Sequence, residues 1–526
     1  MLKQLLIGKV LKPIEEAGFQ VFFVGGCVRD RLKNVPIKDF DICTNATPED
    51  LHKIFKLVSN VSKNSEEFGV TIILVPVENG TSDFMEVEIA TFRADKTLGR
   101  HPQVEFGASI ESDASRRDFT CNALFEDIQG NIIDPTGQGI EDIKNNVLRF
   151  VGDPKSRLQE DPLRIFRFVR FLATKGFKSA HSAEEIEEAV KGLDFSEISK
   201  ERILKEFKQI LAGKFFFFPS QAFTMADRGR VFEVVGLESI FKDMQATIQS
   251  WRFHVEGSVF LDPDGEKFEV TQRMNLSGCT PISHGTVLSH TLLVLNAMHK
   301  IIWEDGFQDG LLVLKACKNS VNFDPATLKF LLMLAAILHD IGKAHCNAGT
   351  KKVSFNFEGL DIVEEVPRVE EHPQVGIEFA EKFCKSLKMS NEETRFICSL
   401  VAHHMEVHKL TKHKSFCKIL DFVHHPFFEE VVLLALADEA GSIVLDESQV
   451  DSMMNIFQDE RVKKAMFMEL PAAVLTGEDL IKFGVKPGPI FKKMLQVARK
   501  IQIDQDITDK KALFNAVKNI ELGKDE

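Results

Sequence analysis

Short apolar and alternating runs are interleaved with helical patterns in the first quarter of the chain. Strands are expected where such runs are bounded by turn-forming residues; they fall at 21–24, 70–75, 86–91, 103–106 and 123–127. Amphipathic helices are expected over 1–19 and 48–58. Residues 1–135 are therefore predicted to form an α/β domain with a small mixed sheet.

Strand patterns fade after Asp134-Pro135, and helical spacing dominates the rest of the chain. Helices are predicted over 161–174, 183–191, 200–212, 219–235 and 489–520, and the turn-rich segment 252–283 is typical of an inserted hairpin or a linker. A chain of 526 residues is too long for one hydrophobic core. The pattern predicts an α+β protein with five parts: 1–135, 136–212, 213–283, 284–440 and 441–526.

The composition narrows the class of protein. The hydrophobic share of 44% is ordinary for a soluble globular chain. The longest clean apolar run, 330–338, is about half of the roughly 20 residues that a membrane helix needs, so no membrane partner is expected. Nine cysteines without a Cys-x-x-Cys pair favour a reducing, cytoplasmic compartment over a disulfide framework.

The charge distribution is uneven. A net charge of −13 argues against a generic nucleic-acid coat protein, and no DNA partner is expected. The segment 142–178 departs from this balance, with nine Lys/Arg against four Asp/Glu. On charge alone, an RNA contact and an ordinary solvated helix face are equally good interpretations of this segment.

Two aspartates follow a glycine turn near the N-terminus. A buried strand runs into Gly25-Gly26, and Asp39 and Asp41 come shortly after it. On a strand these two carboxylates would point to one face and repel each other unless cations lay between them. Mg²⁺ prefers such oxygen ligands, and two ions can stabilise the attacking and leaving oxygens of a displacement at phosphorus. The glycine turn would let backbone N–H groups approach a triphosphate.

Together with Arg29 beside the turn, these residues resemble the class II tRNA nucleotidyltransferase and bacterial poly(A) polymerase family of the polymerase-β superfamily. The resemblance implies a polymerase-β-like head in which Asp39 and Asp41 hold Mg²⁺ and Gly25, Gly26 and Arg29 bind nucleotide. The family also carries an acidic residue on a neighbouring strand. Glu88, on the predicted strand 86–91, is the candidate for this third catalytic carboxylate.

The resemblance continues into a second motif. Arg116-Arg117-Asp118, followed by Asn122, matches the family's Arg-Arg-Asp motif. The match implies that these residues bind the nucleotide, with Asp118 on the ribose hydroxyls.

A third motif, Glu160-Asp161-Pro162-Leu163-Arg164, matches the family segment that selects the base. Cytosine and adenine each present an amine beside an unprotonated ring nitrogen, so a carboxylate can accept from the amine while a guanidinium donates to the nitrogen. Guanine and uracil would leave these groups unpaired. Asp161 and Arg164 are three residues apart and are predicted to share one helix face.

Neighbouring segments extend or qualify the resemblance. Arg167 and Arg170 continue the predicted helix and are expected to reach phosphates, whereas the segment 199–206 resembles a neck motif with a structural role. Family members that add the final A carry an Asp-Gly-Arg signature in a flexible loop before His-Pro. Here that loop reads Leu98-Gly99-Arg100-His101-Pro102, with an acidic residue only at Asp95. Addition of the final A is therefore less well supported than nucleotidyl transfer itself.

Histidines gather in the second half of the chain, where twelve of the 16 lie between His284 and His425. Imidazole and carboxylate side chains suit a divalent transition metal or Mg²⁺. The candidate ligands, in chain order, are His290, His339, Asp340, His372, His403 and Asp438. This ordered set resembles the HD phosphohydrolase superfamily over 284–440, which implies metal-dependent phosphatase and 2′,3′-cyclic phosphodiesterase activities.

The leading hypothesis is an enzyme that adds C, C and A to the acceptor end of tRNA from CTP and ATP. The resemblance then implies a head (1–135), a neck (136–212), a body (213–283), an HD domain (284–440) and a helical C-terminal region (441–526). A poly(A), CC-only or A-only product is the alternative of the same chemistry. The alternative of another class is an HD phosphohydrolase whose N-terminal half only binds RNA.

Overall fold

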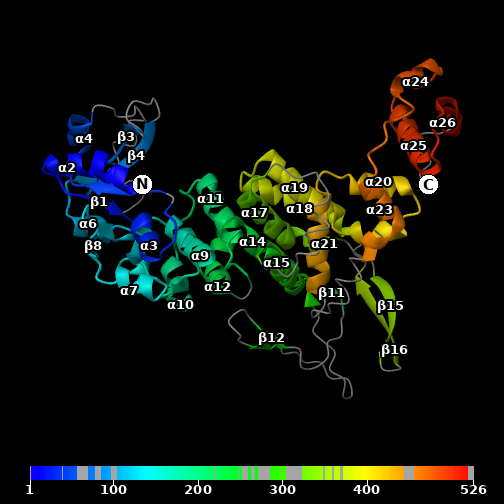
Figure 1. Ribbon diagram of the computed structural model, residues 1–526. Coiled ribbons are helices and arrows are strands. Elements are labelled where there is room, and N and C mark those ends of the chain that lie inside the picture. Colours follow the sequence, from blue (N-terminus) through cyan, green and yellow to red (C-terminus); the bar gives the residue numbers. More distant parts are fainter. Residues whose placement is uncertain are drawn as a thin grey trace. The chain divides into compact units, whose positions relative to one another are not determined.

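The chain divides into two compact units, Met1–Leu237 and Glu238–Glu526, in the computed structural model (Figure 1). The structure describes residues 2–37, 39–55, 69–76, 84–95, 104–217, 220–246, 248–250, 259–261, 267–269, 285–303, 323–346, 350–357, 360–367, 371–442 and 455–518. The predicted α+β class is confirmed, because a small mixed sheet precedes a largely helical remainder.

The first unit is built on a six-stranded sheet with the order β3-β4-β2-β1-β7-β8. Its strands are β1 (Val21–Val24), β2 (Asp41–Thr44), β3 (Val70–Pro76), β4 (Phe84–Thr91), β7 (Phe125–Glu126) and β8 (Ile132–Ile133). Strands β2 and β4 are parallel, and the other neighbours are antiparallel. A separate hairpin pairs β5 (Arg93–Asp95) with β6 (Val104–Phe106). All five predicted strands are confirmed, although β7 is shorter than expected.

An aromatic core anchors the centre of this sheet. All residues of β1 are buried, which explains why its sequence is continuously apolar rather than alternating. The rings of Phe22, Phe92 and Phe125 lie 6.1 Å apart in pairs, and Val24 and Cys43 belong to the same buried cluster. The ends of β1 and β2 are thereby held in fixed positions, and the glycine turn and Asp41 lie at those ends.

Helices cover the sheet and extend the first unit. The N-terminal ones are α1 (Leu2–Leu6), α2 (Lys12–Glu16), α3 (Gly26–Leu32), α4 (Pro48–Ile54), α6 (Ile110–Ser115) and α7 (Gly139–Lys144). They are followed by α8 (Pro154–Glu160), α9 (Leu163–Lys175), α10 (Ala183–Val190), α11 (Lys200–Leu211), α12 (Gln221–Arg228) and α13 (Val231–Val235). A parallel pair of short strands, β9 (Val147–Leu148) and β10 (Lys178–Ser179), lies among them. Helix α9 packs against α11 and α12.

Two helix predictions in this unit need correction. The helix predicted over 219–235 is interrupted at Gly229-Arg230, where Arg230 has a left-handed φ of 60°. The helix predicted over 1–19 is found but ends at Glu16, and it contains a π-helical turn, Ile7–Leu11. Neither the interruption at Gly229-Arg230 nor the π-helical turn changes the spacing of hydrophobic residues enough to be predicted from the sequence.

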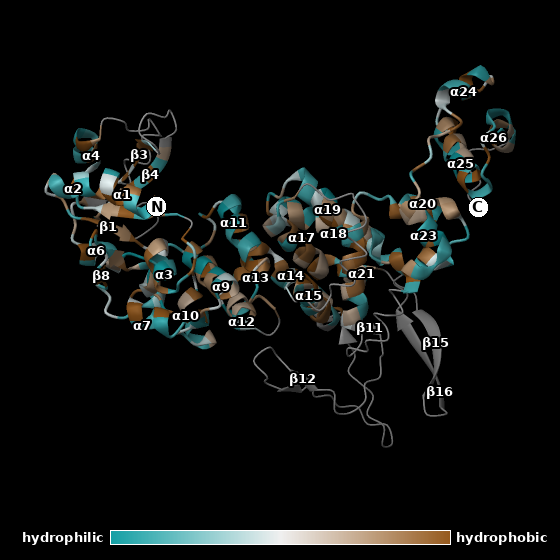
Figure 2. Ribbon diagram, in the orientation of Figure 1, coloured by the Kyte–Doolittle hydropathy of each residue, from teal (hydrophilic) through white to brown (hydrophobic). Residues whose placement is uncertain are grey.

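The second unit is mainly helical. Its helices are α14 (Leu237–Ala246, which begins at the unit boundary), α15 (Val287–Trp303), α17 (Pro325–Leu338), α18 (His372–Ser386), α19 (Asn391–His403), α20 (Phe416–Val423), α21 (Phe428–Ser442), α23 (Glu460–Phe467), α24 (Gly477–Lys482), α25 (Ile490–Gln505) and α26 (Lys510–Val517). Helix α17 is coloured as hydrophobic over most of its length in Figure 2. The stretch Pro325–Ala344 is long and apolar enough to cross a membrane, yet 72% of its most apolar window is buried inside the protein, as in the core helix of a soluble protein.

The described residues of the second unit contain strands, of which only the hairpin of β12 (Val259–Leu261) and β13 (Lys267–Glu269) falls in a segment, 252–283, that was predicted as an inserted hairpin or a linker. An antiparallel hairpin of two eight-residue strands is formed by β15 (Thr350–Phe357) and β16 (Leu360–Pro367). Shorter pairs join β11 (Ile248–Ser250) to β14 (Gly285–Thr286) and β12 to β13. The single helix predicted over 489–520 is two helices, α25 and α26, because Asp506 adopts a left-handed φ of 52°. Most of the turn-rich segment 252–283 lies outside the described residues.

Candidate active site and metal centre

The glycine turn brings a metal-binding candidate close to an arginine. Gly25 has a φ of +73°, in the region that favours glycine, and helix α3 begins at Gly26. A Cβ added at Gly25 would lie 3.5 Å from Arg117 Nη1 and 3.6 Å from Asp41 Oδ2. Thus Gly25, Arg117 and Asp41, which are far apart in the sequence, meet at the end of β1.

The register of the parallel strands places Glu88 beside Asp41. Ile42 pairs with Ile89, so continuing the register by one residue sets Asp41 next to Glu88 on the same face. All three predicted carboxylates, of Asp39, Asp41 and Glu88, are on exposed residues. The expectation that Asp39 shares a strand with Asp41 is wrong, because β2 begins at Asp41.

The surroundings of Asp41 shift its acidity. Although the residue as a whole is exposed, desolvation of the carboxylate beside the turn raises the pKa of Asp41 above its ordinary value. The Arg117 guanidinium opposes this rise in pKa, and the charge of Asp39 adds to it. A positive charge beside the Asp41 carboxylate is therefore favoured, as expected for a site that binds cations.

Four predicted nucleotide-binding residues form one hydrogen-bonded chain, of which Arg29, Asn122 and Asp118 are buried. Arg29 Nη1 donates to Asn122 Oδ1 at 2.7 Å, and Asn122 Nδ2 donates to Asp118 Oδ1 at 3.0 Å. Arg167 then donates to Asp118 Oδ2 from Nε at 2.9 Å and from Nη2 at 2.5 Å. Burial alone would raise the pKa of Asp118, but Arg167 and Asn122 hold it below its ordinary value. Asp118 is therefore a charged acceptor fixed in direction.

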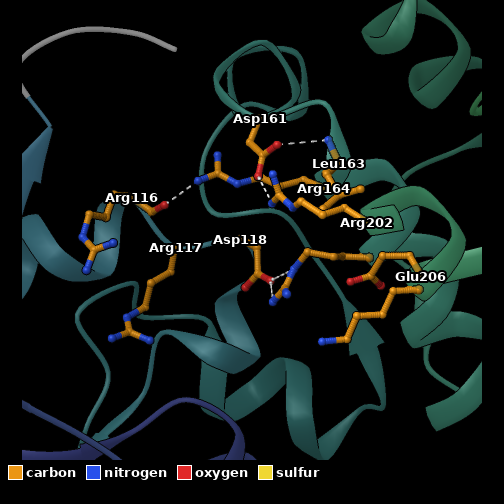
Figure 3. A pocket seen from close by; sticks show the side chains of 10 residues that line it. Arg116, Arg117, Asp118, Asp161, Leu163, Arg164, Arg202 and Glu206 are labelled. Carbon is orange, nitrogen blue, oxygen red and sulfur yellow. Dashed lines mark hydrogen bonds and ion pairs between the residues drawn. The ribbon is translucent and has the colours of Figure 1, made fainter. Parts of the chain in front are cut away.

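A cavity of about 410 Å³ lies next to this chain (Figure 3). Its volume is in the range of small-ligand sites. The lining residues are Arg116, Arg117, Asp118, Asp161, Leu163, Arg164, Arg167, Arg202, Lys205 and Glu206. The cavity thus brings the Arg-Arg-Asp segment and the proposed base-selecting segment together, although more than 40 residues separate Asp118 from Asp161.

Asp161 and Arg164 both line the cavity but do not share a helix. Asp161 ends α8 in an extended conformation, and α9 begins only at Leu163. Asp161 Oδ1 accepts from the Leu163 backbone N–H at 3.2 Å, and this contact is drawn in Figure 3. Arg164 donates to Glu160 Oε2 at 2.6 Å and to the Arg116 carbonyl at 2.8 Å. The prediction of a shared helix face is wrong, because the sequence spacing did not reveal the break before Pro162.

Helix α11 contributes residues that the sequence interpretation assigned a structural role. Arg202, Lys205 and Glu206 line the cavity, at spacings that place them on one helix face. Arg170 Nε lies 2.8 Å from Glu206 Oε2, and Arg170 Nη1 donates to Gln209 Oε1 at 3.2 Å. Arg170 therefore links α9 to α11, and it does not line the cavity. The i, i+3, i+4 spacing of charged residues in 202–206 was the signal that could have located this face.

The second unit holds a cluster of histidines and aspartates. In its first set, His290 Nε2 lies 2.9 Å from Asp438 Oδ1, and His339 Nε2 lies 3.4 Å from His290 Nε2. In its second set, His372 Nε2 lies 3.1 Å from both His404 Nε2 and Asp340 Oδ1. In each set the potential ligand atoms lie within 4.8 Å of one another, close enough to hold a metal ion.

Asp340 faces both sets with different oxygens. Its Oδ2 lies 3.3 Å from His339 Nε2 and 3.5 Å from His290 Nε2, whereas its Oδ1 faces His372 and His404. Within the part of the chain that the structure describes, Oδ1 is buried and receives no hydrogen bond of standard geometry, although His372 Nε2 lies 3.1 Å away. An orphaned oxygen among imidazole nitrogens fits a metal-bridging carboxylate.

Backbone contacts set the ring directions in this cluster. His339 Nδ1 lies 2.9 Å from the Ala336 carbonyl, and His404 Nδ1 lies 2.8 Å from the Val401 carbonyl. A proton on each Nδ1 would leave Nε2 as the free ligand atom. The prediction named His403, but the structure places His404 in the cluster, while His403 Nδ1 contacts the Ser399 carbonyl at 2.9 Å. Consecutive helical residues point about 100° apart, so only one of the pair can face the site.

Charge compensation in the cluster is strong. Burial alone would raise the pKa of Asp340, but His339 and Lys343 hold it well below its ordinary value. Burial would lower the pKa of His339, yet Asp340 and Asp438 raise it to about 10. Lys343 Nζ donates to Asp340 Oδ2 at 2.5 Å. The negatively charged carboxylates therefore retain positively charged partners. A bound divalent ion would replace these partners in compensating the negative charge.

Segments of the chain that carry these two clusters of residues match models of known protein families. Residues 21–149 match the family model of the poly A polymerase head domain, and residues 287–440 match the HD domain. The chain is thus similar to these two domain families over two separate segments, each less than half of its length. Residues 374–517 also match a putative tRNA nucleotidyltransferase domain 2.

Curated relatives resemble part of the chain. A CCA-adding enzyme from Bacillus pumilus is 39% identical over 209 residues, which are 39% of this chain and 49% of that protein. One from Enterococcus faecalis is 40% identical over 208 residues, covering 39% and 48% of the two chains. The chain spans about half the length of the curated relatives it matches.

Solved structures resemble the fold over most of the chain. The CCA-adding enzyme of Bacillus stearothermophilus in complex with CTP gives a TM-score of 0.52 at 21% identity, covering 98% of this chain and 97% of that one. The Thermotoga maritima CCA-adding enzyme complexed with tRNA_CCA gives 0.51 at 16% identity, covering 98% and 93%. At this identity the likeness concerns the fold.

Proposed function

We propose that the chain adds C, C and A to the 3′ end of tRNA, taking the nucleotides from CTP and ATP. The observation that carries the proposal is the meeting of Asp41 with Gly25, Arg117 and Glu88, where Arg117 also lines the 410 Å³ cavity. The segment that carries these residues matches the poly A polymerase head domain, and curated relatives named as CCA-adding enzymes are 39% and 40% identical to the chain over 209 and 208 residues, which supports the same reaction here.

The carboxylates would hold the metal ions of this reaction. A poly A polymerase head domain implies dependence on a divalent metal, and the all-oxygen donor set of Asp39, Asp41 and Glu88 fits Mg²⁺. When bound, two Mg²⁺ ions would stabilise the attacking 3′-oxygen and the leaving pyrophosphate. Backbone N–H groups of the Gly25-Gly26 turn would approach the triphosphate, and Arg117 would contribute positive charge at the same end.

The cavity would orient and select the nucleotide. Asp118, held by Arg167 and Asn122, is suited to accept hydrogen bonds from ribose hydroxyls. Asp161 would accept from the exocyclic amine of C or A, and Arg164 would donate to the adjacent ring nitrogen. In the arrangement described above, Glu160 and the Arg116 carbonyl hold the Arg164 guanidinium, so its plane is fixed before a base arrives.

The same chemistry could end at another product. A poly(A), CC-only or A-only enzyme would use the same carboxylates, and the loop that bears on the final A, 98–102, lies outside the described residues. The proposed division remains a head (1–135), neck (136–212), body (213–283), HD domain (284–440) and C-terminal region (441–526). The seven cysteines among the described residues are unpaired, which supports a reducing compartment.

Product analysis separates these cases. The purified chain is incubated with tRNA lacking its terminal CCA, Mg²⁺ and labelled CTP, ATP, GTP or UTP, and the products are resolved to single nucleotides. We expect C, C and A to be added and extension to stop there. An open-ended A tail would indicate a poly(A) polymerase. Absence of any incorporation would contradict the proposal.

We further propose that the histidine cluster hydrolyses phosphate monoesters or 2′,3′-cyclic phosphates at damaged RNA 3′ ends. The two facing ligand sets and the orphaned Asp340 Oδ1 support binding of one or two divalent ions, either a transition metal or Mg²⁺. The test compares 2′,3′-cyclic phosphodiesterase activity of the wild type with that of a variant carrying both His339→Ala and Asp340→Ala. An unchanged rate in this variant would refute the proposal.

A further inference from the structure

A buried aspartate lies behind the two arginines of the Arg-Arg-Asp segment. Asp113, on α6, is 1% exposed, and each of its carboxylate oxygens contacts a different arginine. Oδ1 accepts from Arg116 Nε at 3.0 Å and from Arg116 Nη2 at 2.5 Å. Oδ2 accepts from Arg117 Nε at 3.0 Å and from Arg117 Nη2 at 2.8 Å. One carboxylate therefore holds both guanidinium groups.

We propose that Asp113 is a positioning residue for nucleotide binding, whose buried carboxylate fixes the directions in which Arg116 and Arg117 face the cavity. This inference rests on the proposed nucleotidyl transfer and names a determinant of its nucleotide affinity. Neither the motif resemblance nor the lining of the cavity includes Asp113, which lies behind the residues that a nucleotide would contact.

The geometry explains how one residue can aim two others. A guanidinium is planar, so fixing its Nε and one Nη group fixes the whole fork. Arg117 is held by its Nε–Nη2 edge, and its Nη1 is directed to the Asn122 carbonyl at 3.4 Å and to the turn at Gly25. The Arg116 carbonyl accepts from Arg164 Nη2 at 2.8 Å, so the same segment also supports Arg164.

The positive charges of Arg116 and Arg117 make their positions depend on the carboxylate of Asp113. The side chains of Arg116 and Arg117 are only 21% and 18% exposed, so solvent compensates their charges incompletely. Without the carboxylate, the two guanidinium groups would lose the one acid that contacts both, and Arg117 would keep only the charges of Asp41 and Asp118, which form no hydrogen-bonded fork with it in the described residues. They would separate toward solvent or toward other acceptors, and neither would keep its direction at the cavity.

A purely structural role is the competing explanation, and the chain offers a matched control for it. Asp142 is also buried, at 5% exposure, and accepts from Arg149 Nε at 3.1 Å and from Thr120 Oγ1 at 2.7 Å. Asp142 does not line the cavity. Loss of either buried acid should lower stability, but only loss of Asp113 should change how the protein binds nucleotide.

The experiment uses the full chain and compares Asp113→Asn with Asp142→Asn. Equilibrium binding of CTP and steady-state incorporation of C into tRNA lacking its end are measured for both. We expect Asp113→Asn to raise the Kd and KM for CTP about tenfold, with a much smaller change in kcat, because ground-state positioning is lost. Asp142→Asn should keep both constants near the wild-type values, even though its thermal stability falls. Unchanged CTP binding in a folded Asp113→Asn variant would overturn the inference.

A second variant covers the case in which Asp113→Asn does not fold. Asp113→Glu keeps the charge and moves the carboxylate by one methylene, so both forks should tilt and the Kd for CTP should rise. Wild-type CTP affinity in Asp113→Glu would overturn the inference. If the wild type binds CTP but transfers no nucleotide to RNA, the proposed function fails. A weaker CTP affinity of the Asp113 variants would then still support the positioning role.

Discussion

A methyl group at Gly342 should disrupt the histidine cluster selectively. Gly342 lies in the 3-10 turn Ile341–Ala344, directly after Asp340, and packs against the start of α18. A Cβ there would lie 1.9 Å from the His372 carbonyl oxygen and 2.7 Å from the Gly376 backbone nitrogen. Real Cβ contacts essentially never fall below 3.0 Å, so Gly342→Ala must move backbone atoms by about 1 Å.

The size of this shift decides its effect. Overpacking of this kind typically costs about 1–3 kcal/mol, which a unit of this size can survive. Metal–ligand distances tolerate only about 0.2 Å, so moving His372 by about 1 Å relative to Asp340 should weaken metal binding severely. Nucleotidyl transfer should be retained, because its carboxylates belong to the other compact unit.

The assay measures three quantities on one preparation: bound metal by elemental analysis, 2′,3′-cyclic phosphodiesterase activity, and C incorporation into tRNA. Gly477→Ala is the matched control in the same unit, since a Cβ there meets no atom closer than 3.8 Å. We expect Gly342→Ala to lose metal and hydrolysis while Gly477→Ala keeps both. Wild-type metal content and hydrolysis in Gly342→Ala would refute the reasoning about the close approach.

Three other predictions test separate parts of the account. His404→Ala should abolish metal binding by the second ligand set while His403→Ala leaves it intact, and equal metal content in the two variants would contradict the placement of His404. Asp161→Ala should reduce the preference for CTP over UTP by about tenfold or more in single-turnover incorporation; an unchanged preference would remove Asp161 from base selection. Burial raises the pKa of Glu430 from its ordinary 4.5 to about 7, so folding stability should fall as pH rises through this interval, by roughly 3 kcal/mol from this group. Glu430→Gln should therefore be more stable than the wild type at pH 8 but not at pH 4, as measured by denaturant unfolding.

The sheet of the first unit was predictable because its signals are local. The continuous apolar run at Val21–Val24 reflects burial of a strand on both faces. The alternation of polar and apolar residues in 86–91 reflects burial on one face. Interruptions between consecutive helices were harder to predict. Arg230 and Asp506 adopt left-handed conformations within apolar periods that continue past them, so periodicity alone reads each pair of helices as one. The β15–β16 hairpin was missed, although apolar and polar residues alternate from Lys352 to Phe357, because the surrounding region is helical.

The candidate sites likewise contain residues that could be predicted from the sequence and residues that could not. Residues adjacent in a motif, such as Asp41 or Asp118, could be named from the sequence, since the chemistry requires those residue types. The choice between His403 and His404 depends on which side chain faces inward from the end of α19, which the sequence does not specify. Arg202 and Lys205 reach the cavity only because α11 packs against α9, a long-range contact. Asp113 stayed hidden because it acts through its neighbours.

The most direct test of the central claim is the effect of Asp41→Ala on nucleotide incorporation into tRNA lacking its end, at saturating Mg²⁺ and CTP. The account predicts that the wild type adds C residues and that Asp41→Ala adds none, because the ligand beside Glu88 and the glycine turn is gone, while the variant remains folded by circular dichroism. Incorporation by Asp41→Ala at a rate comparable to the wild type would contradict the assignment of this carboxylate to the catalytic metal site.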